Sequence, residues 1–205
     1  ANARIEFGHT LQPDPCPSLE LTLKDARNTQ AYVDFFRRHR VRVVNMSFGG
    51  SVGGVEGQLE QCGIGANADE RRKIAREWFD IGKDAFVRAM ASAPEVLFVA
   101  AAGNENADSS FAESIPADIV LPNLITVGAV DKAGDEAPFT SYGKTVVVHA
   151  NGYLVDSVIP GGERLAESGT SMSAPQVTNL AAKILAVNPA LTPPQVIEII
   201  RETAE

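Results

Sequence analysis

Residues 169–187 join a glycine-bounded turn to an apolar helix, and this pairing constrains the fold more than any other segment. Apolar side chains such as Val177, Leu180 and Ile184 fall on nearly every face of the expected helix, so the helix should be buried. Its N-terminus, with free backbone N–H groups and the positive end of the helix dipole, then lies beside Ser171. This arrangement is typical of a nucleophile. A serine that only caps a core helix is the alternative.

Two other segments are typical of buried parallel strands that end in glycine turns. Residues 96–104 form a continuous apolar run that ends in Gly103 and Asn104. Residues 41–50 predict a short strand that runs into two glycines, where the backbone of a ligand can approach closely. Residues 68–90 show apolar positions at helical spacing, with Asn67 and Glu70 placed as a cap pair. A helix between two such strands predicts a parallel β-α-β unit.

The remaining segments give less specific predictions. Residues 31–40 predict a helix with Tyr32, Phe35 and Phe36 on its buried face, and the glycine-rich residues 51–67 predict an irregular loop. Further along, residues 146–148 and 154–159 predict antiparallel strands. A final helix should open at Thr192-Pro193-Pro194.

Three strings of the sequence carry a resemblance to a known family. Val-Asn-Met-Ser-Phe-Gly-Gly at residues 44–50, Ala-Ala-Gly-Asn at 101–104 and Gly-Thr-Ser-Met at 169–172 resemble the subtilisin-like serine proteases, the subtilase family. The resemblance covers most of residues 41–205. It implies an α/β, subtilisin-like three-layer fold, with a mostly parallel sheet flanked by helices. Residues 1–205 would then form part of one catalytic domain.

The resemblance also implies roles for individual residues. Ser171 would be the acylating nucleophile, and the Asn104 amide would donate to the oxyanion together with the Ser171 backbone N–H. Ile115-Pro116 matches a position where the family often carries a cis peptide bond. A polypeptide substrate would lie against two segments. Its backbone would pair with an extended edge formed by Ser47, Phe48 and Gly49. The residue before the scissile bond would enter a pocket with one wall formed by Ala101, Ala102 and Gly103.

The sequence departs from the family where the other members of the catalytic triad should stand. Subtilases carry an aspartate before Ser-Gly or Thr-Gly and a histidine in His-Gly-Thr-His, and neither frame occurs here. Each histidine favours a structural place: His9 at a strand end, His39 at a helix end and His149 within a strand. We therefore expect the C-terminal part of a protease domain, with the N-terminal portion missing. Such a chain should have little activity, because no base takes the hydroxyl proton.

Two hypotheses of function remain. The first is a peptide hydrolase whose aspartate and histidine lie upstream of Ala1, and the alternative is a degenerate protease or another non-catalytic module that binds peptides. The presence of both Ser171 and Asn104 favours the enzyme. A missing central strand predicts a gap or an exposed edge in the sheet, beside residues 3–7 or 41–46. An N-terminal segment of the same protease, or self-association, would cover that edge.

Composition excludes some partners. The net charge of -8 argues against nucleic acids and anionic membranes, and no apolar run is long enough to span a bilayer. Cys16 and Cys62 allow one disulfide but do not have the spacing of a metal site. We predict no cofactor and no metal, since the calcium loops frequent in subtilases are not recognisable here. Only the resemblance bears on localisation, and it suggests a secreted or periplasmic protein. Glu105, beside Asn104, would favour a basic substrate residue at the pocket rim.

Overall fold

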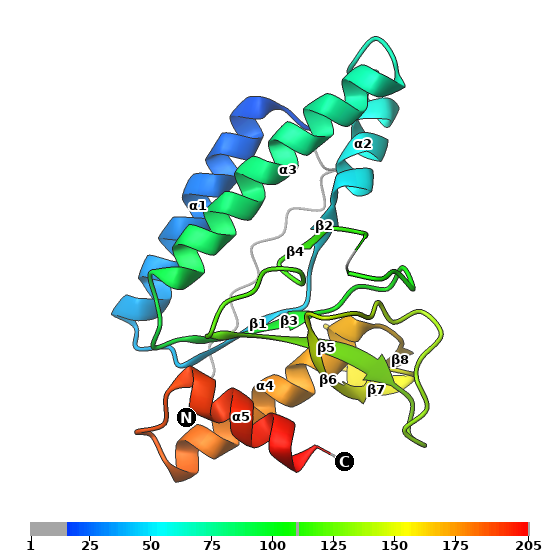
Figure 1. The fold of residues 1–205 in the computed structure, drawn as a ribbon. Helices are drawn as coiled ribbons and strands as arrows, with labels where there is room; N and C mark the ends of the chain where they lie inside the picture. The colour runs from blue at the N-terminus through cyan, green and yellow to red at the C-terminus, as the bar shows by residue number, and fades with distance from the viewer. Residues whose placement is uncertain (1–15, 110, 205) are drawn as a thin grey trace.

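The structure, a computed structural model, describes residues 16–109 and 111–204. Its centre is a parallel sheet whose four strands follow the order β1 (Val43–Met46), β3 (Leu97–Ala101), β5 (Leu124–Val130) and β6 (Val146–Asn151). Helices cover both faces (Figure 1). On one face lie α1 (Leu19–Arg38) and α3 (Ala68–Ala91), and on the other α4 (Thr170–Val187) and α5 (Pro193–Thr203). The predicted three-layer α/β fold is confirmed.

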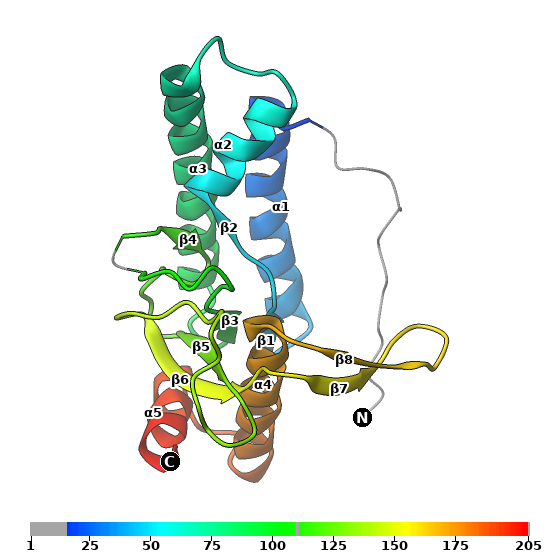
Figure 2. The ribbon, with the colours of Figure 1, turned by 90° about the vertical axis from the view of Figure 1, so that its right-hand side faces the viewer.

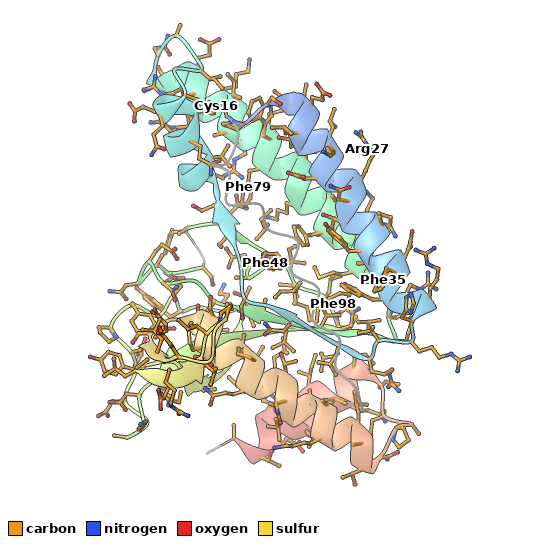
Figure 3. The ribbon with its side chains drawn as sticks, turned by 180° about the vertical axis from the view of Figure 1, so that it is seen from behind. Cys16, Arg27, Phe35, Phe48, Phe79 and Phe98 are labelled. Atoms are coloured by element: carbon orange, nitrogen blue, oxygen red, sulfur yellow. A yellow bond between two sulfur atoms is a disulfide. The ribbon has the colours of Figure 1, made fainter. Side chains whose placement is uncertain are left out.

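Strand β3 lies at the centre of both hydrophobic cores, which explains its continuous apolar sequence. Leu97 and Val99 face the layer that contains α4 and α5. Phe98 and Ala100 alternate with them and face the opposite layer, as Figure 3 shows for Phe98. Successive side chains of a strand point to opposite faces, so a strand covered on both sides is apolar at every position. All five residues of β3 are buried.

Strand β1 forms an edge of the sheet. Among the described residues its only strand partner is β3, with Val43 opposite Leu97 and Met46 opposite Ala100. The side of β1 away from β3 therefore lacks a strand partner in the described sheet, in agreement with the predicted exposed edge. Residues 3–7, which we expected to flank the same gap, lie outside the described part of the chain.

Helix α1 differs from the prediction in its start and in its buried face. It begins at Leu19, because Ser18 caps it by accepting a hydrogen bond from the Leu21 backbone N–H. Tyr32 and Phe35 are 62% and 48% exposed, so the predicted burial of these two side chains is wrong. Val33 is the buried residue of the helix, because that side of α1 packs in the core beside α3.

The prediction of a loop at residues 51–67 is wrong for most of that segment, which contains helix α2 (Val52–Gln61). The Ser51 hydroxyl accepts a hydrogen bond from the Gly54 backbone N–H at the first turn, and Leu59 is fully buried. A disulfide from Cys16 to Cys62 joins the end of α2 to the segment before α1. Capping, burial and the crosslink together outweigh the low helix propensity of glycine. Figure 2 shows α2 beside the N-terminal half of α3.

The remaining predictions for the C-terminal half are partly confirmed. Strand β6 pairs parallel with β5, so its predicted antiparallel pairing is wrong. An antiparallel hairpin follows it, formed by β7 (Val155–Val158) and β8 (Arg164–Glu167), and projects from the body of the protein (Figure 2). The predicted cap of α3 is present, with the Asn67 side chain accepting from the Glu70 backbone N–H. Helix α5 opens at Pro193 as predicted. No helix in the described residues has the length and apolar character needed to cross a bilayer.

Candidate active site

Ser171 is the second residue of α4 and lies at the carboxyl end of β1. Its hydroxyl donates to the Ser47 carbonyl oxygen at 3.4 Å, and its own carbonyl oxygen accepts from the Ser47 hydroxyl at 2.8 Å. The side chain is half-buried. The start of α4 therefore places the Ser171 hydroxyl in the first turn of the helix, at the positive end of its dipole, as the sequence predicted.

Asn104 follows β3 and reaches the same helix start. Its side-chain oxygen Oδ1 accepts from the Thr170 backbone N–H at 2.8 Å and from the Thr170 hydroxyl at 3.0 Å. Because both partners are donors at this atom, the other amide atom is the nitrogen Nδ2, and none of the described residues accepts a hydrogen bond from it. Asn104 and Ser171 line one cavity, so the structure brings the two predicted catalytic residues together.

Thr170 connects the two segments, a role that the sequence analysis did not assign. The side chain is buried, donates to Asn104 and accepts from the Gly103 backbone N–H at 3.1 Å. One hydroxyl thus orders both the Asn104 side chain and the turn that carries it. The signal in the sequence was a threonine in the first turn of a buried helix, where a hydroxyl finds free backbone groups.

The cavity beside Ser171 has a volume of about 390 Å³. The predicted substrate residues line it with the exception of Ser47, which contacts Ser171 instead. Small side chains leave the space open. The lining residues include Phe48, Gly49, Ala101, Ala102, Gly103, Asn104, Glu105, Ser114, Asp118, Ser141, Thr170 and Ser171.

Gly103 is a position where the site requires glycine. Its φ is 109°, in the left-handed region that other residues rarely adopt. A Cβ added there would lie 2.7 Å from Glu105 Oε2 and 3.0 Å from the Ser141 hydroxyl. Glu105 Oε2 accepts from the Asn104 backbone N–H at 2.8 Å and from the Ser141 hydroxyl at 3.4 Å. The carboxylate of Glu105 therefore lies over Gly103, at the turn that carries Asn104.

Ser114 and Asp118 contribute to the lining of the pocket. Strand β4 (Ser114–Ile115) pairs with β2 (Gly50–Ser51), and the Ile115-Pro116 bond is cis, as predicted. Asp118 Oδ2 accepts from the Ser114 backbone N–H at 2.5 Å, and Oδ1 accepts from the Thr145 hydroxyl at 3.3 Å. Burial raises the pKa of the Asp118 carboxyl, although these hydrogen bonds act in the opposite direction.

Neither described histidine lines the pocket. His39 ends α1, where its ring lies 4.1 Å from that of Phe35. His149 is on β6 and packs so closely over Gly128 that an added Cβ would lie 2.3 Å from the ring. His9 lies outside the described residues. Within residues 16–109 and 111–204, no cluster of three or more His, Cys, Asp or Glu side chains is arranged to hold a metal ion.

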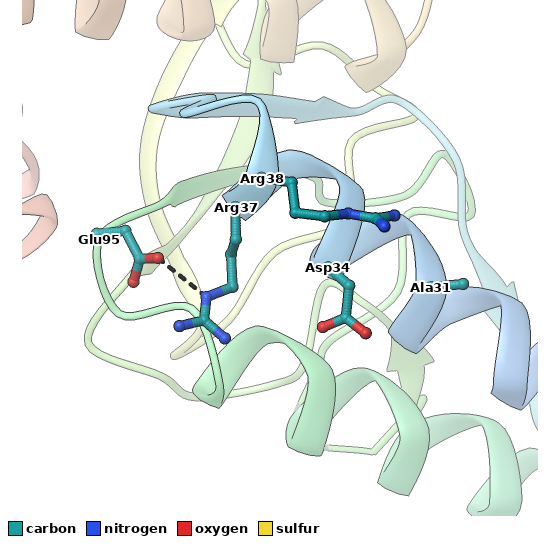
Figure 4. A pocket seen from close by; sticks show the side chains of 5 residues that line it. All are labelled: Ala31, Asp34, Arg37, Arg38 and Glu95. Carbon is teal, nitrogen blue, oxygen red and sulfur yellow. Dashed lines mark hydrogen bonds and ion pairs between the residues drawn. The ribbon is translucent and has the colours of Figure 1, made fainter.

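A second hollow, between α1 and the loop before β3, lacks the features of a catalytic site (Figure 4). Its volume is about 590 Å³, and Arg37 Nε donates to Glu95 Oε1 across it at 3.0 Å. The pKa of Glu95 is lowered by a backbone hydrogen bond and by Arg37. The described residues that line it include no serine, cysteine or histidine: Ala31, Asp34, Arg37, Arg38 and Glu95.

Comparisons with known proteins point to one family. The profile of the Subtilase family matches residues 16–205. Subtilisin of Bacillus pumilus is 38% identical over 109 residues, which are 53% of this chain and 39% of that protein. Alkaline protease 1 of Aspergillus clavatus is 39% identical over 124 residues, 58% of this chain and 30% of that protein.

Solved structures agree with these relatives. The crystal structure of a cold adapted subtilisin-like serine proteinase matches with a TM-score of 0.59 and 26% identity. The match covers 86% of this chain and 54% of that one. The chain thus spans only part of the length of the proteins that it resembles.

Proposed function

The chain belongs to the subtilase family, and from this premise we propose that the protein is a serine endopeptidase that cleaves polypeptides through an acyl-enzyme on Ser171. The observation that carries the proposal is the meeting of Ser171 and Asn104 in one pocket at the start of α4. Two hydrogen bonds from Thr170 fix the Asn104 oxygen, so that its amide nitrogen, which has no acceptor among the described residues, can donate to a ligand. A fixed donor beside a serine hydroxyl is what acyl transfer requires.

In the proposed reaction, the Ser171 oxygen attacks the carbonyl carbon of the scissile peptide bond. A bond forms between that oxygen and the carbon, and negative charge develops on the carbonyl oxygen. The Asn104 Nδ2–H and the Ser171 backbone N–H would donate to this oxyanion, with the positive end of α4 adding to its stabilisation. Because the charge exists only near the transition state, these donors lower the barrier selectively. The C–N bond of the peptide then breaks, and the amine leaves with the proton that the base took from Ser171. Water adds to the acyl-enzyme, the bond to the Ser171 oxygen breaks, and the serine hydroxyl regains a proton from the same base.

The hydroxyl proton of Ser171 needs a base. We assign that role to a histidine, oriented by an aspartate, from chain outside these 205 residues. Three observations support this assignment. Neither described histidine lines the pocket, β1 has one strand neighbour in the described sheet, and the match covers 39% of a Bacillus subtilisin. Without the added residues the chain should hydrolyse peptides slowly at most, since oxyanion donors alone leave only residual catalysis.

The substrate would bind in an extended conformation. Residues 47–49 lie at the carboxyl end of the edge strand β1, where a substrate backbone could pair with them. Ala101, Ala102 and Gly103 would form the wall against which the residue before the scissile bond packs. Their small side chains leave room for a side chain of the substrate.

A test of this function is the Asn104→Leu variant of the protein that carries the complete triad. We expect kcat to fall by about 10²–10³ with little change in KM, a magnitude measured on a subtilisin and adopted here for its relative. The matched control is Asn179→Leu, an exposed position of α4 that does not line this pocket. A rise in KM with unchanged kcat would remove Asn104 from the oxyanion hole. Absence of peptide hydrolysis by the unmodified protein would favour a non-catalytic peptide binder.

A further inference from the structure

We propose that the pocket beside Ser171 selects a basic residue, lysine or arginine, immediately before the cleaved bond. The inference rests on the proposed peptidase function, because it assigns the substrate class of the same site. Two carboxylates, Glu105 and Asp118, line this pocket, and no Lys, Arg or His side chain is among its described lining residues. A basic side chain would supply the missing positive charge.

The Glu105 carboxylate is already held in place. Its Oε2 atom accepts from the Asn104 backbone N–H and from the Ser141 hydroxyl, and it lies over the Cα of Gly103. Gly103 belongs to the wall proposed to contact the substrate residue before the scissile bond. A carboxylate fixed there loses little further rotational freedom when a cation binds, which favours recognition.

Asp118 adds a second negative charge to the lining of the same pocket. It is half-buried, and desolvation raises the pKa of its carboxyl. Lys83 lowers the Asp118 pKa through its charge alone, because the Lys83 ammonium donates its hydrogen bond to Glu113, at 2.9 Å. A cation bound in the pocket would stabilise the ionised carboxylate, since an opposite charge within about 4–6 Å favours the charged form.

The other charged groups near Asp118 are already paired. Glu113 accepts from both Arg76 and Lys83, so its charge is neutralised from the α3 side. The hydroxyl of Thr145 donates to Asp118 but carries no charge. The excess negative charge of the pocket therefore comes from Glu105 and Asp118.

The shape of the cavity suits a long side chain with a charged end. Its volume of about 390 Å³ is bounded largely by Ala, Gly and Ser residues, which leave space for an aliphatic stem. Lysine and arginine bury such stems along apolar surface while the charged head meets a polar partner. A glutamate at the same place would face two like charges. Phenylalanine would fit, but would leave both carboxylates without a counter-charge.

The test uses peptides that differ only at the residue before the scissile bond: Arg, Lys, Phe or Glu. For the protein with the complete triad, we expect kcat/KM for the Arg and Lys peptides to exceed that for the Phe peptide by about tenfold. An exposed ion pair would give only a few-fold effect, and the half-buried Asp118 should raise it above that. The Glu peptide should be the poorest substrate.

Variants separate the two carboxylates while keeping their hydrogen-bond acceptors. Glu105→Gln and Asp118→Asn should each lower the Arg/Phe ratio, and the double variant should bring it to about one, since amides carry no charge. Glu202→Gln is the control, because Glu202 is an exposed carboxylate on α5, outside the pocket. An unchanged Arg/Phe ratio in the double variant would overturn the inference.

A binding measurement keeps this result distinct from a failure of the proposed function. Product peptides that end in Arg, Phe or Glu are titrated calorimetrically against the Ser171→Ala form of the same protein. Tighter binding of the Arg peptide supports the inference even when no peptide is hydrolysed. Equal binding of the Arg and Phe peptides overturns it. Hydrolysis of all four substrates at equal kcat/KM contradicts only the selectivity. Absence of hydrolysis together with selective binding of the Arg peptide contradicts only the peptidase function.

Discussion

Replacing Thr170 by valine should weaken both the fold and the catalytic site, because one hydroxyl links the two. Valine has nearly the same shape but cannot donate to Asn104 Oδ1, and it cannot accept from the Gly103 backbone N–H. The backbone N–H of residue 170 still donates to Asn104 at 2.8 Å. The asparagine is therefore loosened rather than released.

The magnitude follows from the two hydrogen bonds. Loss of the bond to Asn104 should cost about 1 kcal/mol, and the unpaired Gly103 N–H at least about 1 kcal/mol more. Gly103 is only half-buried, so we take the lower end, about 2 kcal/mol in the free energy of unfolding. For a domain of this size, that corresponds to a fall in Tm of about 4–8 °C. We expect kcat to fall about tenfold, less than the 10²–10³ for deleting an oxyanion donor.

The assay is thermal unfolding of the Thr170→Val protein, with peptide hydrolysis measured on the form that carries the complete triad. Thr203→Val is the control, since Thr203 is exposed on α5 and its hydroxyl donates to the Ile199 carbonyl of its own helix. Equal changes in Tm for the two variants would refute the special role of Thr170. If Thr170→Val lowered the stability by the predicted amount but left kcat unchanged, the position of Asn104 would not depend on the Thr170 hydroxyl.

Three further predictions concern the frame around the site. Cys62→Ala opens a crosslink between residues separated by 46 positions, so the free energy of unfolding in a urea titration should fall by up to about 4 kcal/mol, and a reductant should no longer lower it further. Gly152→Ala would bring a Cβ to 2.8 Å from the Gly169 carbonyl oxygen, so we expect about 1–3 kcal/mol of destabilisation and a lower kcat, whereas Gly57→Ala, with open space around it, should be neutral or stabilising. The pKa of Glu113 is lowered by hydrogen bonds from Arg76 and Lys83, so its stabilisation is present above the usual glutamate pKa and is lost as the pH falls through the lowered one. Because the Glu113 side chain is 36% exposed, Glu113→Gln should lower the free energy of unfolding by only about 0.5–1 kcal/mol at neutral pH. In acid, the free energies of unfolding of the variant and of the unmodified protein should become equal.

The sequence predicted best those elements whose environment is uniform. Strand β3 is covered on both faces, so its continuous apolar run identified it. Helix α4 was also identified as a helix, but its predicted burial on nearly every face is wrong, because Leu180 and Val187 are 42% and 88% exposed. Turns that need glycine or an amide, such as Gly103-Asn104, were recognisable because few residue types satisfy their geometry.

Predictions failed where tertiary contacts decide the outcome. Phe35 and Tyr32 are exposed because α1 turns the Val33 side toward the core, and their spacing alone does not choose between the two faces. Helix α2 forms in a glycine-rich segment because a cap, the buried Leu59 and a disulfide support it. Thr170 and Asp118 were missed for a related reason. Thr170 bonds to Asn104 and Asp118 bonds to Thr145, and each of these partners lies tens of residues away in the chain.

The most direct test of the central proposal is covalent labelling of the protein with the complete triad by a fluorophosphonate, a reagent that phosphonylates activated serines. Intact mass and peptide mapping should show one phosphonyl group, located on Ser171, and none in the Ser171→Ala variant. Labelling should slow markedly in Asn104→Leu, because the reaction also places charge on an oxygen that the Asn104 amide would stabilise. An unlabelled protein, or a label on another residue with Ser171 unmodified, would contradict the assignment of Ser171 as the nucleophile.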